Sequence, residues 1–184
     1  MNFRYLCFPS LLALVPLGGA VLFARPVYGG TDHLVREILP AMGIESLAFS
    51  STTSLHDVEA MVYAHEADDR LRMILIETPA NPTNCLIDIS RCAELARRFS
   101  TKDRKVYLAV DNTFLGPLWQ HPLEHGADLV IYSATKYIGG HSDLIAGATL
   151  LNYVPLRPGL LGRLAYHKAV NHIPLADSAR TVLQ

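Results

Sequence analysis

The chain lacks most of the features that mark a disulfide-stabilised, metal-binding or nucleic-acid-binding protein. Its 184 residues contain three cysteines, Cys7, Cys85 and Cys92, an odd number at no metal-ligand spacing. This usage fits a reduced, cytoplasmic setting better than a disulfide framework. The formal net charge of −1 lacks the basic excess that a nucleic-acid surface usually needs, so we expect no nucleic-acid partner. His121 and His125 stand four residues apart, but no third ligand is evident, and we expect no metal site.

The chain also lacks an uninterrupted apolar run. Residues 5–24 are largely apolar, but two prolines and two glycines break this stretch, which is barely long enough to span a membrane. We therefore expect no membrane association. Two interpretations remain open: a signal peptide with Leu11–Leu17 as its apolar centre, or a globular segment. The globular segment would be the end of a buried helix over Leu11–Val15, a turn, and a strand over Ala20–Ala24.

Beyond this stretch, short apolar runs alternate with amphipathic segments, in a chain long enough for one domain with a hydrophobic core. The expected strands are Ala20–Ala24, Ile44–Phe49, Met73–Ile76, Val106–Val110, Leu129–Tyr132 and Leu144–Leu151. The helices between them are expected to begin at Thr31 or Asp32, at Ser54 or Asp57, and at Ser90. This alternation predicts an α/β fold with a mostly parallel sheet and helices on both faces.

Polar loops follow three of the expected strands. The first loop holds Asn81 between two prolines, which fix the backbone and leave it little entropy to lose. The second loop begins at Asp111 and the third at Ser133. Ligands of parallel α/β sheets bind at the carboxyl ends of the strands. We therefore expect Asn81, Asp111 and Lys136 to cluster at one edge of the sheet.

The third loop carries Lys136 soon after a buried strand. Such a lysine can occupy a partly desolvated pocket, where the ammonium form is disfavoured and the amine is a nucleophile toward a carbonyl. The hydroxyls of Ser133 and Thr135 are compact donors for a phosphate. Gly139 and Gly140 allow the backbone to turn sharply around a ligand.

The stretch from Asp128 to Ser142 begins with an acidic residue and an expected strand. Ser-Ala-Thr-Lys, an aromatic residue and Gly-His-Ser then follow in that order. It resembles the lysine signature of the Cys/Met-metabolism enzymes that use pyridoxal 5'-phosphate (PLP), and two upstream segments match as well. The resemblance covers about residues 10–155. It implies the large cofactor domain of aspartate-aminotransferase-like (fold type I) PLP enzymes. Family members have a helix, a Pro-Gly turn and a strand before Tyr-Gly-Gly-Thr, which favours the globular interpretation of residues 5–24.

The resemblance also implies a role for each candidate residue, because each part of PLP needs a partner. Lys136 would form the Schiff base, and Asp111 would pair with the pyridinium nitrogen. Tyr28 would stack on the ring, and Asn81 would lie beside the ring hydroxyl. Ser133 and Thr135 would hold the phosphate. The structural alternatives are a loop-capping aspartate, a half-buried tyrosine and ordinary turn residues. His141 is expected to be structural, because Lys136 can itself move protons once the substrate displaces it.

The implied reaction is PLP-dependent elimination or replacement at the beta or gamma carbon of sulfur amino acids, of the cystathionine gamma-synthase or gamma-lyase type. The partners would be a small-molecule amino-acid substrate and further copies of the chain in a homo-oligomer. Residues 1–160 are expected to form the PLP-binding large domain without its N-terminal arm, and residues 161–184 the truncated start of a linker or C-terminal domain. Arg180 has no motif context and receives no role. The alternative is a catalytically incompetent fragment that retains the cofactor domain.

Overall fold

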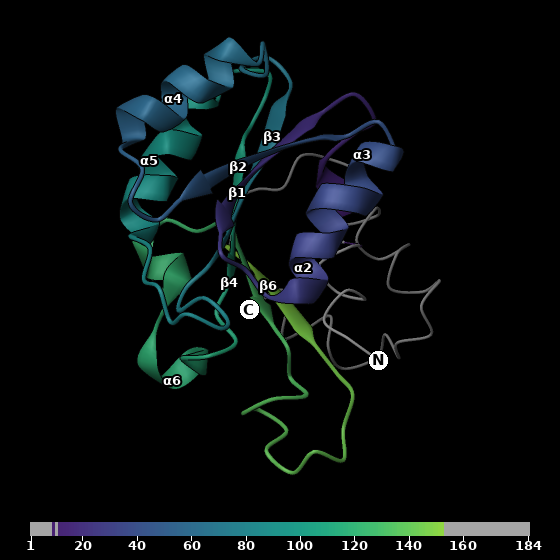
Figure 1. Ribbon diagram of the computed structural model, residues 1–184. Helices are drawn as coiled ribbons and strands as arrows, with labels where there is room; N and C mark the ends of the chain where they lie inside the picture. Colours follow the sequence, from purple (N-terminus) through teal and green to yellow (C-terminus); the bar gives the residue numbers. More distant parts are fainter. Residues whose placement is uncertain (1–8, 10, 153–184) are drawn as a thin grey trace.

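One sheet of six strands forms the centre of the molecule (Figure 1). The computed structural model describes residue 9 and residues 11–152. The strands are β1 (Ala20–Arg25), β2 (Glu45–Ser50), β3 (Leu71–Glu77), β4 (Tyr107–Asp111), β5 (Leu129–Tyr132) and β6 (Ala148–Leu151). Their order is β2-β1-β3-β4-β5-β6, the first five strands are parallel, and β6 is antiparallel to β5. The expected mostly parallel sheet is therefore confirmed.

Helices cover both faces of this sheet (Figure 1). They are α2 (Gly29–His33), the π-helical η1 (Leu34–Ile38), α3 (Leu39–Ala41), α4 (Leu55–Ala64), α5 (Ile89–Phe99), α6 (Gly116–Trp119) and the 3-10 helix η2 (Pro122–His125). The segments α2, η1 and α3 follow one another without a break and pack on one face. The helices α4 and α5 pack on the other face.

Each face has its own hydrophobic core, because successive side chains of a strand point to opposite sides. In β3, Met73 and Leu75 belong to the core beneath α2, η1 and α3, whereas Ile74 and Ile76 belong to the core beneath α4 and α5. None of these four side chains is more than 1 % exposed. Full burial of one such side chain is worth ~1.5–3 kcal/mol. Both cores therefore hold β3, and with it the position of its carboxyl end.

Residues 11–24 of the apolar N-terminal stretch are part of the same domain. Residues 11–14 are helical, a turn follows, and β1 lies between β2 and β3 in the sheet. The strand expected over Ala20–Ala24 is confirmed, and the complete burial of Val21 and Leu22 supports the globular interpretation of this stretch. None of the helices within residues 9 and 11–152 is both long and apolar enough to cross a membrane. The expected boundary near residue 160 and the segment 161–184 lie outside the described residues.

The helix after β1, α2, begins earlier than the capping pattern predicts. Its first residue is Gly29, and Tyr28 is the capping residue, so the prediction of a cap at Thr31 or Asp32 is wrong. The Tyr28 carbonyl accepts the N–H groups of Thr31 and Asp32 at 2.8 and 2.9 Å. Backbone hydrogen bonds, rather than a capping side chain, thus set the start of α2.

Two further element starts differ from the prediction, and one agrees. Asp88 caps α5 in place of Ser90, so this helix begins two residues earlier than its predicted cap implies. Ser54 caps α4 as predicted, by accepting the Asp57 N–H at 3.1 Å. The last strand begins at Ala148 and not at Leu144. The chain before it is held elsewhere, because the Ala146 carbonyl accepts the hydroxyl of Thr135, in the loop that contains Lys136.

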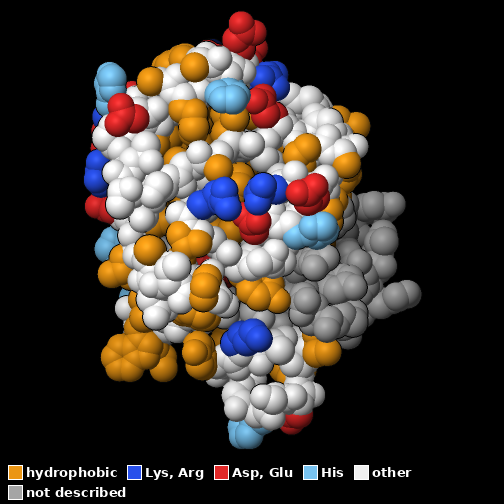
Figure 2. All heavy atoms as spheres, in the orientation of Figure 1, with side chains coloured by type: hydrophobic (Ala, Val, Ile, Leu, Met, Phe, Trp, Pro, Cys, Tyr) orange, Lys and Arg blue, Asp and Glu red, His pale blue; other side chains and the backbone are white. Residues whose placement is uncertain are grey.

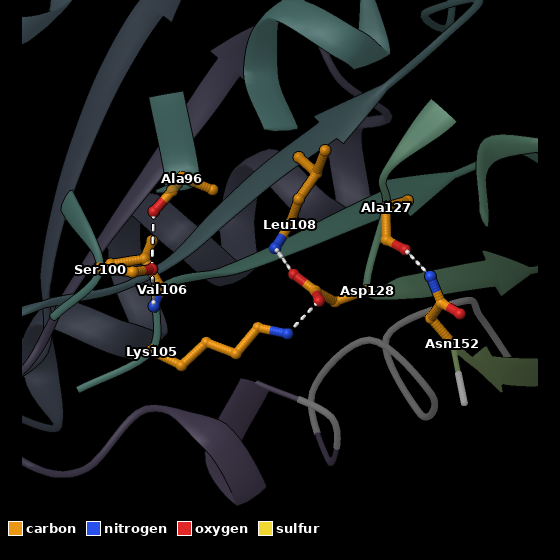
Figure 3. A network of polar contacts seen from close by, with 8 residues as sticks. All are labelled: Ala96, Ser100, Lys105, Val106, Leu108, Ala127, Asp128 and Asn152. Carbon is orange, nitrogen blue, oxygen red and sulfur yellow. Dashed lines mark hydrogen bonds and ion pairs between the residues drawn. The ribbon is translucent and has the colours of Figure 1, made fainter. Parts of the chain in front are cut away.

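The amino ends of β4 and β5 are held together by Asp128 (Figure 3). Its carboxylate accepts the Leu108 N–H at 2.9 Å and forms an ion pair with Lys105. Close by, the Ser100 hydroxyl accepts the Val106 N–H at 3.0 Å, which ties the end of α5 to the start of β4. This network lies at the edge of the sheet opposite the carboxyl ends of the parallel strands.

We expect Asp128→Ala to lower the free energy of unfolding by about 1–3 kcal/mol, because the Leu108 N–H loses a charged acceptor. Equilibrium urea denaturation measures this loss. Lys105→Ala leaves the Leu108 hydrogen bond in place. It removes the ion pair, in which the lysine side chain is 35 % exposed, and the contact of Lys105 Nζ with the Tyr107 ring at 5.2 Å, and should cost no more than about 1 kcal/mol. Equal losses in the two variants would show that the ion pair, and not the hydrogen bond to Leu108, supplies the stabilisation.

Candidate active site

The carboxyl ends of β3, β4 and β5 bring the three predicted polar loops to one edge of the sheet. Glu77 ends β3 and Asp111 ends β4, and the two residues are paired in the parallel register. Asp111 is in turn paired with Ile131, two residues before Ser133. The register thus places the starts of all three loops side by side.

Glu77 and Asp111 lie on the same face of the sheet. Leu75 and Ala109, two residues before them, both belong to the core beneath α2, η1 and α3, and strand residues two apart share a face. Glu77 and Asp111 are each only 5 % exposed. The site therefore contains two buried carboxyl groups on the face that α2 covers.

The Glu77 carboxyl group contacts two backbone segments that come from different parts of the site. Its Oε2 accepts the Tyr28 N–H at 2.6 Å, and its Oε1 accepts the Asn81 N–H at 2.9 Å. Tyr28 directly precedes α2, and Asn81 lies in the Pro-rich loop after β3. Two residues predicted from the sequence, Tyr28 and Asn81, are thus held at the same strand end.

Asp111 is connected to the loop after β5 through Thr113. The Asp111 Oδ1 atom accepts the Thr113 N–H at 3.0 Å and the Thr113 hydroxyl at 2.6 Å. The same hydroxyl accepts the Ser133 N–H at 2.9 Å. Within the part of the chain that the structure describes, both hydrogen bonds to the Asp111 carboxyl group end on Oδ1. Its Oδ2 is therefore available to a further donor.

The electrostatics of this edge favour a bound proton or cation. Burial raises the pKa of Asp111 to about 7, the negative charge of Glu77 adds to the shift, and the Thr113 hydrogen bonds oppose it. Burial also raises the pKa of Glu77, against the opposing hydrogen bonds from Tyr28 and Asn81. A cationic group beside Asp111 would relieve both the desolvation and the repulsion.

Lys136 lies in the loop after β5 but is exposed, so the desolvated pocket predicted from the sequence is wrong for the chain as described. The buried strand ends at Tyr132, and a turn follows in which the Lys136 N–H donates to the Ser133 carbonyl at 2.9 Å. Gly140 has a φ of +78°, a conformation that favours glycine, as expected for a sharp turn. The backbone of Lys136 is thus tied to the site while its side chain reaches solvent.

Of the two residues whose hydroxyls are predicted to bind phosphate, only Ser133 is linked to Asp111, and the link runs from its backbone N–H through the Thr113 hydroxyl. The Thr135 hydroxyl donates to the Ala146 carbonyl at 3.1 Å and accepts the Ala146 N–H at 3.0 Å. A hydroxyl has one proton, so Thr135 can donate to a phosphate only by giving up the Ala146 carbonyl. His141 is exposed, as a structural role allows, and its Nδ1 lies 3.0 Å from a backbone carbonyl.

A second polar network supports the site from the opposite face of the sheet. The Nδ2 of the fully buried Asn112 shares its two protons among three acceptors: the carbonyls of Gly116 and Gln120 at 3.0 and 2.9 Å, and the Tyr132 hydroxyl at 3.0 Å. Gln120 in turn donates to the Thr78 carbonyl at 2.8 Å. These bonds connect the ends of β3, β4 and β5 and so limit movement of the loop that contains Asp111.

Comparison with known proteins identifies the family to which this arrangement belongs. The model of the family described as Cys/Met metabolism PLP-dependent enzyme matches residues 7–157. The chain belongs to this family. The resemblance of the lysine stretch is thereby confirmed, and with it PLP as the cofactor of the family.

Curated members of the Cys/Met-metabolism family are similar to most of this chain. Cystathionine gamma-lyase of Saccharomyces cerevisiae is 37 % identical over 147 residues, which are 80 % of this chain and 35 % of the relative. Cystathionine gamma-synthase of Mycobacterium leprae is 37 % identical over 143 residues, which are 78 % of this chain and 34 % of the relative. The chain thus spans about a third of the length of the relatives it matches.

Solved structures confirm the predicted fold. The metB protein of Corynebacterium glutamicum matches with a TM-score of 0.79 at 28 % identity, over 98 % of this chain and 43 % of that chain. A Campylobacter jejuni protein named as an O-acetylhomoserine (thiol)-lyase matches with a TM-score of 0.74 at 27 % identity, over 83 % of this chain and 35 % of that chain. The Campylobacter structure holds N'-pyridoxyl-lysine-5'-monophosphate.

The residues at the carboxyl edge fit the cofactor of the Cys/Met-metabolism family. Asp111 offers a buried carboxyl group with one oxygen open to a ring nitrogen, and Lys136 stands on the adjoining loop. Ser133 and Thr135 bring hydroxyls to the same loop. Within residues 9 and 11–152, no group of three or more His, Cys, Asp or Glu side chains is placed to hold a metal ion.

Glu77 and Thr113 connect the predicted residues, although neither was itself predicted to belong to the site. Glu77 closes an apolar run directly before a polar loop, just as Asp111 closes the next one. That shared pattern was the available signal for Glu77. Thr113 follows Asp111 by two residues, the spacing at which an aspartate commonly binds the backbone of a turn.

Proposed function

We propose that the chain binds PLP at the carboxyl edge of β3, β4 and β5, where the Lys136 amine would hold the cofactor covalently and the Asp111 carboxylate would accept a hydrogen bond from the protonated ring nitrogen. The observation that carries this proposal is the buried Asp111 carboxyl group, with Oδ2 open and Oδ1 linked through Thr113 to the lysine loop. A carboxylate in a buried setting favours a protonated ring nitrogen, because their attraction is little screened.

The remaining contacts follow from the same placement. Glu77 holds the backbone of Tyr28 and of Asn81 beside Asp111. In the proposed site, Tyr28 stacks on the cofactor ring and Asn81 lies beside the ring hydroxyl. Ser133 and Thr135 bind the phosphate, and Thr135 does so by exchanging its bond to a backbone carbonyl for one to a phosphate oxygen.

The reaction that we propose is elimination or replacement at the beta or gamma carbon of a sulfur amino acid. The similar relatives are named as cystathionine gamma-lyase, cystathionine beta-lyase and cystathionine gamma-synthase. When bound, PLP supplies the electron sink for a carbanion at the alpha carbon of the substrate. Asp111 sustains that sink by holding a proton on the ring nitrogen. The Lys136 amine, once the substrate has displaced it, removes and returns the protons.

The exposure of Lys136 favours a second outcome, in which the isolated chain binds the cofactor but turns over little substrate. Water around an exposed lysine stabilises its ammonium form, which cannot add to a carbonyl. Positioning of the reacting groups can lower the activation barrier by ~7–11 kcal/mol. A site open to solvent positions these groups less well and lowers the barrier less. We therefore propose strong turnover only where further protein surface encloses Lys136.

Association with further copies of the chain is a second part of the proposal. Leu118 and Trp119 of α6 are 81 % and 79 % exposed, and Tyr137, next to the cofactor lysine, is 71 % exposed. Figure 2 shows apolar atoms gathered over α6, at the lower left of the view. Exposed apolar patches of this kind mark association surfaces.

A cytoplasmic location is supported by the unpaired state of Cys85 and Cys92.

The cofactor site is tested by fixing the bond between PLP and protein with borohydride and mapping the labelled peptide. We expect the label on Lys136 in preference to Lys102, Lys105 and Lys168, the other lysines of the chain. Lys102→Ala serves as the matched control, because Lys102 is also exposed but lies before β4, at the opposite edge of the sheet. A label spread evenly over all four lysines would contradict the proposed site.

A further inference from the structure

Glu77 is a buried carboxyl group that no step of the proposed reaction uses directly. It accepts one N–H from a residue 49 positions away, Tyr28, and one from a residue four positions away, Asn81. It is also the register neighbour of Asp111. We propose that Glu77 is a positioning residue of the cofactor site: it holds the Tyr28 and Asn81 segments beside Asp111 and adds its negative charge to the position of the ring nitrogen. This inference rests on the proposed PLP site.

The geometry requires a side chain with two acceptor oxygens. Each Glu77 oxygen serves a different segment, at 2.6 Å for Tyr28 and 2.9 Å for Asn81. Hydrogen bonds to a charged acceptor are shorter and stronger than neutral ones. A glutamine would have one acceptor oxygen and an NH2 group that faces a second donor. An aspartate would keep the charge but is one methylene shorter.

The alternative is that Glu77 only stabilises the first turn of α2, since Tyr28 precedes that helix. The charge of Glu77 distinguishes the two roles. Glu77 is the charged group that contributes to the raised pKa of Asp111, so its field reaches the atom expected to meet the ring nitrogen. A residue that served only the helix would have no effect on a cation at Asp111.

The experiment compares Glu77→Gln and Glu77→Asp with wild type in the full chain, using two readouts. Amide hydrogen exchange of the unliganded chain, followed by NMR, reports the bonds to Tyr28 and Asn81. An absorbance titration with PLP reports the dissociation constant. For Glu77→Gln we expect faster exchange at one or both amides and about tenfold weaker PLP binding. For Glu77→Asp we expect the exchange defect to persist while much of the PLP affinity returns with the charge.

Asp128→Asn is the matched control, because Asp128 also accepts a backbone N–H at a strand end but at the opposite edge of the sheet. It should speed exchange at Leu108 and leave PLP affinity within about twofold of wild type. Unchanged exchange at Tyr28 and Asn81 in Glu77→Gln, or unchanged PLP affinity beside normal wild-type binding, would overturn this inference alone. A wild-type chain that binds no PLP would overturn the proposed function and this inference with it.

Discussion

Lys136→Ala is expected to abolish the absorbance band that forms when PLP is added to the wild-type chain. The band requires a covalent bond to an amine. Among the three lysines within residues 11–152, Lys136 is the one tied to the carboxyl edge, because its N–H donates to the Ser133 carbonyl. Lys105 cannot replace Lys136. Lys105 lies before β4, at the opposite edge of the sheet, where it forms an ion pair with Asp128. The measurement is a PLP titration followed by absorbance, at one pH and with free PLP subtracted.

Lys105→Ala is the control for this loss and should keep the band, although it weakens the network at the amino ends of the strands. A Lys136→Ala protein with the same band as wild type would show that another amine is the cofactor lysine. A band lost equally in both variants would indicate that unfolding, and not the missing amine, removes it. Circular dichroism of each variant at the titration temperature separates these results.

The strands were predictable to within a few residues because most of them are apolar runs with polar neighbours. β3 and β5 are buried along their whole length apart from Arg72, so their sequences carry a continuous hydrophobic signal. The three polar loops were expected to lie together because the carboxyl ends of parallel strands lie at the same edge of a sheet. The site edge was thus predictable from local pattern plus one topological rule.

The features that the sequence did not predict depend on backbone turns and on contacts between distant residues. Tyr28 caps α2 through its backbone, and its N–H binds Glu77, 49 residues along the chain. The exposure of Lys136 is set by the turn after β5, about which the apolar strand carries no information. The bonding of Thr135 to Ala146 likewise spans 11 residues and shortened the last predicted strand. Local propensity cannot report such tertiary bonds.

Asp111→Asn is expected to change stability and cofactor binding in opposite directions. Burial raises the pKa of Asp111 from an ordinary value of 3.8 to about 7, so the folded chain holds a proton that the unfolded chain has released. Stability conferred by that proton is complete below about pH 4 and is lost as the pH rises to about 7. The loss amounts to roughly 4 kcal/mol, because each pKa unit corresponds to about 1.4 kcal/mol. Asparagine keeps the acceptor for Thr113 and has no charge to bury.

The measurement is urea denaturation of wild type and Asp111→Asn at pH 5 and pH 8. Wild type should lose more stability than the variant between the two pH values, so that the variant is the more stable protein at pH 8. Exposed Thr101 supplies the control, since Thr101→Ala removes no titratable group and should follow the wild-type pH dependence. Equal pH dependence in wild type and Asp111→Asn would contradict the raised pKa.

The same Asp111→Asn protein should bind PLP more weakly, because a neutral amide cannot pair with a protonated ring nitrogen as a carboxylate does. A residue that merely caps a loop would show the reverse pattern at pH 8, with lower stability on substitution and unaltered cofactor affinity. Gain of stability together with loss of PLP affinity is the signature of a charge that is buried for function at the expense of the fold. PLP titration and denaturation of one protein sample at pH 8 therefore decide between the cofactor role of Asp111 and the capping role.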